Sequence, residues 1–215
     1  MFCKVLWKYS GVLISGYKPK LKWENNNSPA LTALRLQALL ETPHGLRGYR
    51  SGGRGIRMSA VKVRKYLEER GLEDRITTHT ETIDTVEHAA QQIGCSEAEI
   101  AKTLSFLVDE KPVIVVMAGD TRVNSSKFKA QFHEKPHMIP REDVERITGD
   151  LPGGVCPFAI PAGIPIWLDI SLKRFETVHP AGGDEFTSVA ITPTELARAS
   201  GAIGWCDVCK GWLPD

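Results

Sequence analysis

The chain has 215 residues, of which 42% are hydrophobic and 25% are charged, and its formal net charge is +1. These values are typical of a soluble globular protein with one domain and an extension, or at most two small domains. The sequence also excludes a membrane-spanning helix, because no apolar run approaches the roughly 18–20 residues that such a helix needs.

The net charge is unevenly distributed along the chain. Residues 1–57 carry ten Lys or Arg and two Glu, a charge of +8, whereas residues 58–215 carry seventeen basic and twenty-four acidic side chains, a charge of −7. We interpret 1–57 as a basic N-terminal extension, either disordered or an over-extended translation start with Met58 as the true beginning. Two other interpretations stay open: an arm that contacts nucleic-acid phosphates, and an organellar presequence.

From residue 58 onward, helix signals and strand-like alternation are interspersed. Capping residues such as Ser59, Asn124 and Thr192 mark helix starts, and Thr192-Pro193-Thr194-Glu195 has the full capping-box pattern. The predicted helices cover 59–70, 84–94, 96 to about 102, 124–132, 140–147 and 192–200. The predicted strands cover 75–80, 101–108, 112–118, 164–169 and 186–191. Because strict βαβ alternation is absent, we expect a single α+β domain over 58–202, with helices packed on a mixed sheet.

The five cysteines, an odd number at irregular spacing, do not form a disulfide framework, so we expect reduced thiols and a cytoplasmic location. Near the end, Trp205-Cys206-Asp207-Val208-Cys209-Lys210 looks like a thioredoxin motif, but too few residues follow it for that fold. A zinc site would need further ligands at recognisable spacing. We therefore expect 203–215 to be a packed tail with a Cys-x-x-Cys, and we expect neither a metal nor another cofactor.

Two features are typical of a ligand site. Lys102 enters an apolar hairpin, and lysine is rarely fully buried without a partner or a task. The loop Gly153-Gly154-Val155-Cys156-Pro157 offers backbone N–H groups that a ligand can approach closely. Together they indicate a site for an anionic or carbonyl-bearing substrate. Each also has a structural interpretation, as a lysine at a helix C-terminus and as a plain turn.

In order and spacing, several segments resemble the YbaK/EbsC family, the free-standing relatives of the editing domain of bacterial prolyl-tRNA synthetases. They are the Lys102 segment, Gly119-Asp120, the Gly-x-x-x-Pro loop at 153–157, and Gly182-Gly183 before a strand that ends in Thr-Pro-x-Glu-Leu. The resemblance spans 59–202. It implies a mixed, barrel-like sheet flanked by helices. It also implies a trans-editing aminoacyl-tRNA deacylase, which hydrolyses the ester of a mischarged tRNA, here tRNA(Pro) carrying Cys, Ala or another small amino acid.

The resemblance also implies roles for individual residues. A positioned water attacks the ester with help from the substrate's own ribose hydroxyl, and the N–H groups of Gly153, Gly154 and Val155 stabilise the oxyanion. Lys102 suits the terminal phosphate or the ribose. The substrate-binding residues are then Asp169, which orients the α-amino group or a water, together with Cys156, Pro157, Gly182 and Gly183.

Some of these assignments have rivals in the sequence. Asp169 also suits a helix cap, and Gly182-Gly183 also suits a hairpin turn. Cys156 as a nucleophile would need a base, and none is recognisable in the sequence. The histidines show no ligand spacing, so we expect them to be surface or packing residues.

The expected partners are mischarged tRNA and prolyl-tRNA synthetase, for a monomer or weak dimer. The acidic domain needs a local cationic patch to hold RNA, for which the candidates are Lys62, Arg64, Lys65, Lys127 and Lys129. Two other functional classes compete with the deacylase: a catalytically silent module that binds a tRNA end or a synthetase, and a thiol-redox or metal-sensing protein that uses Cys206 and Cys209.

Overall fold

The computed structural model describes residues 58–212, so the predictions made for 1–57 and 213–215 lie outside the described residues. The helices in this part are α2 (Met58–Glu68), α3 (Val86–Ile93), α4 (Ser125–Phe132), α5 (Arg141–Thr148) and α6 (Pro193–Ser200), with short 3-10 turns η1 (Glu73–Arg75), η2 (Glu97–Glu99) and η3 (Ile170–Arg174). The strands are β1 (Ile76–Thr78), β2 (Ile100–Val108), β3 (Lys111–Ala118), β4 (Arg122–Val123), β5 (His137–Met138), β6 (Ile166–Asp169), β7 (His179–Pro180), β8 (Thr187–Val189), β9 (Gly204–Cys206) and β10 (Cys209–Lys210).

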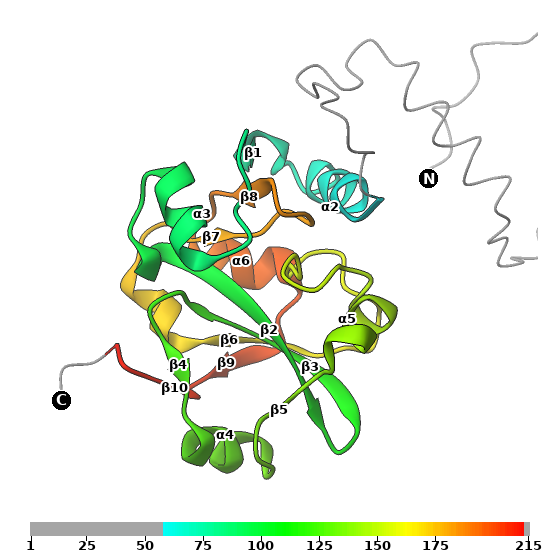
Figure 1. Cartoon of the computed structure of the whole chain (residues 1–215), viewed down its shortest axis with the longest axis vertical. Helices are drawn as coiled ribbons and strands as arrows, with labels where there is room; N and C mark the ends of the chain where they lie inside the picture. Colours follow the sequence, from blue (N-terminus) through cyan, green and yellow to red (C-terminus); the bar gives the residue numbers. More distant parts are fainter. Residues whose placement is uncertain (1–57, 213–215) are drawn as a thin grey trace, which may run out of the picture. The chain divides into compact units, whose positions relative to one another are not determined.

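The central sheet runs in the order β5-β2-β3-β6-β9, and β7 also pairs with β2. The β2–β3 hairpin is antiparallel and turns at Asp109 and Glu110, both of which adopt positive φ. β6 and β9 extend the sheet in parallel. Figure 1 shows these strands across the middle of the domain, with α4 below them and α2 above. The predicted α+β class and the mixed sheet are confirmed. Among the described residues the sheet has two ends, so it does not close into a barrel.

Alternation along β2 and β3 gives the sheet two buried faces. On one face, Ala101 packs with Val116, with α2 through Leu67 and with α6 through Leu196. On the other face, Phe106 packs with Val115, with α4 through Phe128 and with Cys209 of β10. Residues directly opposite each other in an antiparallel pair point to the same side of the sheet. The register therefore fixes the face on which every β2 side chain lies.

Most predicted helix starts are confirmed. Asn124 caps α4, Thr192 and Glu195 form a capping box at α6, and Thr85 caps α3 one residue after the predicted start. The predicted helix from 96 to about 102 is wrong: Ser96 caps only the three-residue turn η2, and β2 begins at Ile100. The pairing of this segment with β3 outweighs its local helix signal.

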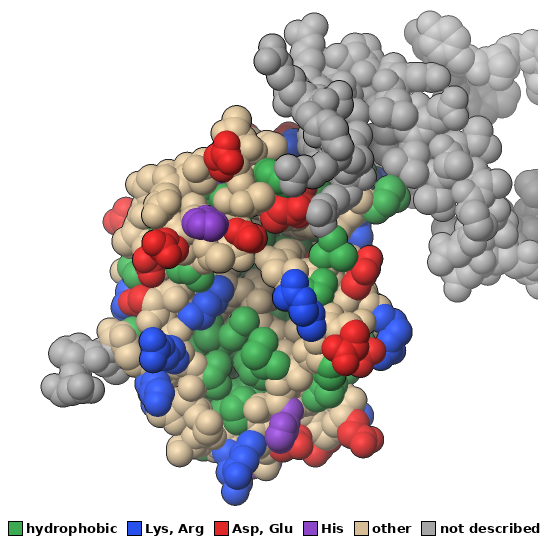
Figure 2. All heavy atoms as spheres, viewed as in Figure 1, with side chains coloured by type: hydrophobic (Ala, Val, Ile, Leu, Met, Phe, Trp, Pro, Cys, Tyr) green, Lys and Arg blue, Asp and Glu red, His purple; other side chains and the backbone are tan. Residues whose placement is uncertain are grey.

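Within the segment predicted as a tail, 203–215, the described residues 203–212 contribute β9 to the central sheet and β10 to a pair with β4. Within residues 58–212, no helix combines the length and the apolar character needed to cross a membrane. Figure 2 shows hydrophobic side chains gathered near the middle of one face, with Lys and Arg side chains at their border and acidic side chains above them and along the right-hand side of the view.

Candidate functional site

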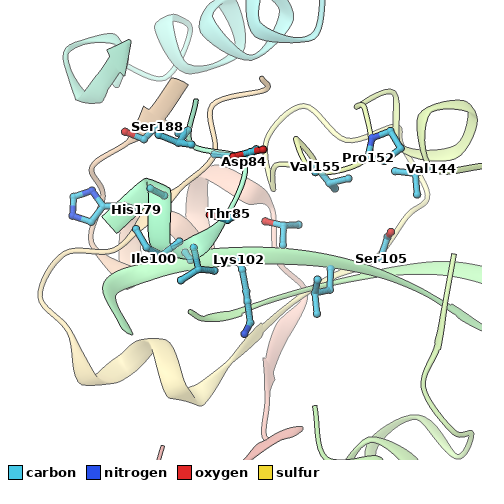
Figure 3. A pocket seen from close by; sticks show the side chains of 18 of the residues that line it. Asp84, Thr85, Ile100, Lys102, Ser105, Val144, Pro152, Val155, His179 and Ser188 are labelled. Atoms are coloured by element: carbon cyan, nitrogen blue, oxygen red, sulfur yellow. The ribbon is translucent and has the colours of Figure 1, made fainter. Parts of the chain in front are cut away.

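A pocket of about 550 Å³ opens beside β2. Its lining includes Thr103 and Ser105 of β2, the segment around the start of α3, the start of α5, the glycine loop and residues from 179 to 188. Figure 3 shows Val155 on one side of the space and His179 on the other. Lining of this kind, largely apolar with a few polar groups, is typical of small-molecule sites.

Lys102 borders the pocket, but its ammonium lies elsewhere. Lys102 stands opposite Met117, whereas Thr103 stands opposite Val116, so the two neighbouring side chains lie on opposite faces of the sheet. The Lys102 Nζ donates to Gly119 O at 3.0 Å and also to Thr121 O. Figure 3 shows the side chain extending away from Asp84, Val155 and Ser188. Burial lowers the pKa of Lys102.

The turn that Lys102 holds has no room for a side chain at Gly119. A Cβ on Gly119 would lie 2.1 Å from the backbone oxygen of Glu97 and 2.7 Å from Val86 Cγ1. Glu97 belongs to η2 and Val86 to α3, which lines the pocket. The end of β3 therefore touches the segments that lead into the pocket.

The glycine loop forms one wall of the pocket through Pro152, Gly153 and Val155, whereas Gly154 is buried behind it. The Gly154 N–H donates to Leu151 O at 2.9 Å, so this amide is already used within the loop. The amides of Gly153 and Val155 have no acceptor among residues 58–212. Two of the three predicted oxyanion donors thus line the pocket.

Five further predicted residues do not line the pocket, namely Asp169, Cys156, Pro157, Gly182 and Gly183. Asp169 is fully buried and caps η3, because its carboxylate accepts from Ser171 N at 2.9 Å and from Val208 N at 2.8 Å. Cys156 is also fully buried, and burial raises the pKa of its thiol well above the ordinary value.

The glycine pair Gly182-Gly183 follows Ala181, which does line the pocket. Gly182 N donates to Thr187 O at 2.6 Å, as in a hairpin, and a Cβ there would lie 2.5 Å from Thr187 Cγ2. Gly183 has a φ of +101° and packs against α2, where a Cβ would lie 2.9 Å from Val63 Cγ2. Both glycines are required by close packing behind the pocket wall.

Three polar pocket residues escaped the sequence analysis. Asp84 lies at the pocket beside α3, and its hydrogen bond with His88, 3.0 Å from Asp84 Oδ1 to Nδ1, lowers the pKa of the carboxyl. Thr103 Oγ1 is buried and has no hydrogen-bond partner among the described residues. Ser188 Oγ lies 2.8 Å from His79 Nε2, and burial lowers the pKa of that imidazole. Of the three, only Asp84 stands at a position with a local signal, the start of the helix predicted over 84–94.

Cys206 and Cys209 lie in the core on the sheet face that also carries Lys102, away from the pocket. Burial, reinforced by the nearby Asp169 carboxylate, raises the pKa of both thiols, that of Cys209 to about 12. Both are free cysteines. Among residues 58–212 there is no cluster of three or more His, Cys, Asp or Glu that could hold a metal ion.

Comparisons with known proteins point to one family. The family model described as aminoacyl-tRNA editing domain matches residues 80–199. The chain is 38% identical over 156 residues to the uncharacterized protein YwhH of Bacillus subtilis, covering 72% of this chain and 99% of that protein. It is 27% identical over 154 residues to the proline–tRNA ligase of Bacillus licheniformis, covering 71% of this chain but 27% of the ligase.

Solved structures agree with this similarity. The crystal structure of the hypothetical protein APE2540 superposes with a TM-score of 0.64 at 33% identity, covering 69% of this chain and 99% of that one. A proposed trans-editing enzyme for prolyl tRNA synthetase superposes with a TM-score of 0.66 at 27% identity, covering 73% of this chain and 100% of that one. By the family match and the structural likeness together, this chain belongs to the aminoacyl-tRNA editing domain family.

Proposed function

We propose that this protein is a deacylase that hydrolyses the ester of mischarged tRNA, acting on tRNA(Pro) that carries Ala, Cys or another small amino acid. The observation that carries the proposal is the pocket beside β2, in a chain of the editing-domain family. The similarity to proline–tRNA ligases supports tRNA(Pro) as the carrier. Editing of this kind meets a physical need, because a synthetase pocket discriminates a missing methylene by only about 1–3 kcal/mol.

Asp84 is the group that we propose for the α-ammonium of the amino acid. Its carboxylate is exposed at the pocket and, like that of an ordinary aspartate, is ionised at neutral pH, and the hydrogen bond with His88 lowers its pKa further. This replaces the expectation for Asp169, whose two oxygens are occupied by the amides of Ser171 and Val208. An ionised carboxylate beside an ammonium fixes the orientation of the ester without taking part in the bond that breaks.

The amides of Gly153 and Val155 are proposed to stabilise the oxyanion as water adds to the ester carbonyl. The ester is already activated, so a positioned water, assisted by the ribose hydroxyl of the substrate, supplies the nucleophile. Thr103 Oγ1, buried without a partner, would gain its hydrogen bond from the bound substrate or from that water. In this proposal the Lys102 ammonium stabilises the turn after β3 through its hydrogen bond to Gly119 O, and it does not contact the phosphate.

Arg141 is the cation that we propose for the phosphate of the tRNA end. It is exposed at the start of α5 and borders the pocket. RNA affinity depends on contacts between cations and phosphates. A single arginine therefore adds little RNA affinity to a domain with a charge of −7 over 58–215. We therefore propose that a synthetase partner delivers the tRNA. We also propose that the reaction takes place in the cytoplasm, where tRNA is charged.

The test measures hydrolysis of Ala-, Cys- and Ser-tRNA(Pro) by the purified protein, with Pro-tRNA(Pro) as the cognate control. The diagnostic variant is Thr103→Val, which removes the buried hydroxyl and keeps the shape, and Thr77→Val on the exposed strand β1 is its matched control. Thr103→Val should lower kcat/KM about tenfold, the equivalent of about 1.4 kcal/mol. Its stability should not fall, since the lost hydroxyl has no partner in the free protein.

The deacylase would be supported if the protein hydrolyses at least one of the three small esters and leaves Pro-tRNA(Pro) intact. Thr103→Val should then slow this hydrolysis, and Thr77→Val should not. A folded protein that binds tRNA and hydrolyses none of the esters would refute it, and would favour a binding module of the same fold.

A further inference from the structure

The loop that forms one pocket wall is anchored by a buried carboxylate outside the pocket. Asp150, only 2% exposed, lies three residues before Gly153, the first residue of the glycine loop. Its Oδ2 accepts from Cys156 N at 3.1 Å, and its Oδ1 accepts from the hydroxyl of Ser59 in α2. Each carboxylate oxygen thus has a donor, and the two donors come from different parts of the fold.

The bond to Cys156 N joins the two ends of the loop. Between Asp150 and Cys156 lie the residues that reach the pocket, and the turn inside is closed by the bond from Gly154 N to Leu151 O. Figure 3 shows Pro152 and Val155 of this loop on the side of the pocket that faces His179 and Ser188. The position of the pocket wall therefore depends on the hydrogen bond by which Asp150 holds the two ends of segment 150–156 together.

The bond to Ser59 ties the same loop to α2, which does not line the pocket. The backbone of Ser59 also meets the second pocket segment, because a Cβ on Gly183 would lie 3.0 Å from Ser59 O. The hydroxyl and the carbonyl of one residue thus contact the two glycine-containing loops on either side. Helix α2 therefore contacts both loops through Ser59.

We propose that Asp150 is a positioning residue, which, with Ser59, sets the distance of the glycine-loop wall from β2 and thereby the largest amino acid side chain that the pocket admits. This inference rests on the proposed function. Its physical basis is that one methylene changes discrimination by about 10–200-fold, so a small displacement of the wall alters selectivity more than it alters the chemistry.

The charge of Asp150 makes the anchor sensitive to pH. Burial raises the pKa of Asp150, and the hydrogen bonds from Ser59 and Cys156 and the ammonium of Lys62 offset part of that effect. The other titratable group that faces it is the Cys156 thiol, whose own pKa is raised well above its ordinary value. As pH falls through the raised pKa, the carboxyl gains a proton and becomes a weaker acceptor for both donors.

The experiment compares the full-length wild type with Asp150→Asn, Ser59→Ala and Ser59→Thr, the last of which keeps the hydroxyl. The destabilised control is Glu195→Gln, which weakens the cap of α6 outside the pocket. Two readouts are measured for each: the ratio of hydrolysis rates for tRNA(Pro) charged with alanine and with 2-aminobutyrate, and amide hydrogen exchange of residues 151–156. The rate ratio is followed from pH 5 to pH 8.

We expect the alanine preference to fall about fivefold or more in Asp150→Asn and Ser59→Ala, with faster exchange in the loop, while Ser59→Thr and Glu195→Gln keep both readouts. The wild-type preference should weaken at low pH, and the Asn variant should lose that dependence. Unchanged exchange in both Asp150→Asn and Ser59→Ala would overturn the positioning role. A wild type that hydrolyses neither ester, with exchange faster in those two variants, would refute the proposed function and leave Asp150 as the anchor of the loop.

Discussion

The position of Lys102 leads to a prediction that separates structural support from catalysis. Lys102→Met removes the ammonium and keeps most of the apolar stem, so Gly119 O and Thr121 O each lose a charged donor. A hydrogen bond to a charged group is worth about 1.5–3 kcal/mol, and the half-buried site allows water to replace part of it. We therefore expect the free energy of unfolding to fall by about 2–4 kcal/mol, which for a domain of this size lowers Tm by roughly 5–15 °C.

The assay is urea unfolding followed by circular dichroism, with Lys111→Met on the exposed start of β3 as the matched control. A Lys102→Met protein within about 0.5 kcal/mol of wild type would refute the supporting role. Activity gives the second discrimination. Measured where the variant is fully folded, hydrolysis should stay within a few-fold of wild type, and a loss of about 100-fold there would return the ammonium to the chemistry.

Three other substitutions test single contacts. Gly119→Ala should cost about 3 kcal/mol, because its Cβ would lie 2.1 Å from a backbone oxygen that cannot move alone; a Tm equal to wild type would contradict this. Glu195→Gln should cost about 0.3–1 kcal/mol at pH 7, because the amide keeps one acceptor oxygen for Thr192 but loses the negative charge at the helix N-terminus. The hydrogen bonds from Thr192 hold the pKa of Glu195 below its usual range, so this stabilisation is present above the ordinary pKa and is lost as pH falls through the folded one. The Tm difference from wild type should therefore shrink below about pH 4, and a constant difference would argue against the cap. Cys156→Ala should keep hydrolysis within about threefold, since a buried thiol of raised pKa is scarcely ionised; loss of activity in a folded variant would revive the nucleophile.

Local signals predicted the elements well, but the strand register determined the site. Caps such as Asn124 and Thr192 act through hydrogen bonds within one turn, which a sequence displays directly. The helix expected from 96 to about Lys102 is wrong, because β2 already begins at Ile100. The strand pairing of these few residues decides on which face of the sheet the side chain of Lys102 lies. Once Lys102 stands opposite Met117, its ammonium lies on the face opposite to Thr103.

The residues that the sequence analysis missed share a physical reason. Asp84 and Thr103 become notable only when residues remote in the chain enclose them, and nothing local distinguishes them from a cap and a strand residue. Asp169, expected at the substrate, accepts from the amide of Val208, a partner 39 positions away. Whether a polar side chain is free to bind a ligand depends on such distant partners.

The strands β9 and β10 complete the sheet and the core of the domain. β9 pairs with β6 in parallel, and β10 pairs with β4. Val208, between the two strands, and Cys209, the first residue of β10, are fully buried. A chain shortened to residue 202 would leave an open edge on β6 and a gap in the core beside Phe128. These contacts join residues about 40 to 90 positions apart, so forming them costs more loop-closure entropy than forming local contacts does. During synthesis, the domain therefore cannot complete its core until residues 204–210 have left the ribosome, and until then the edge of β6 is exposed to other strands.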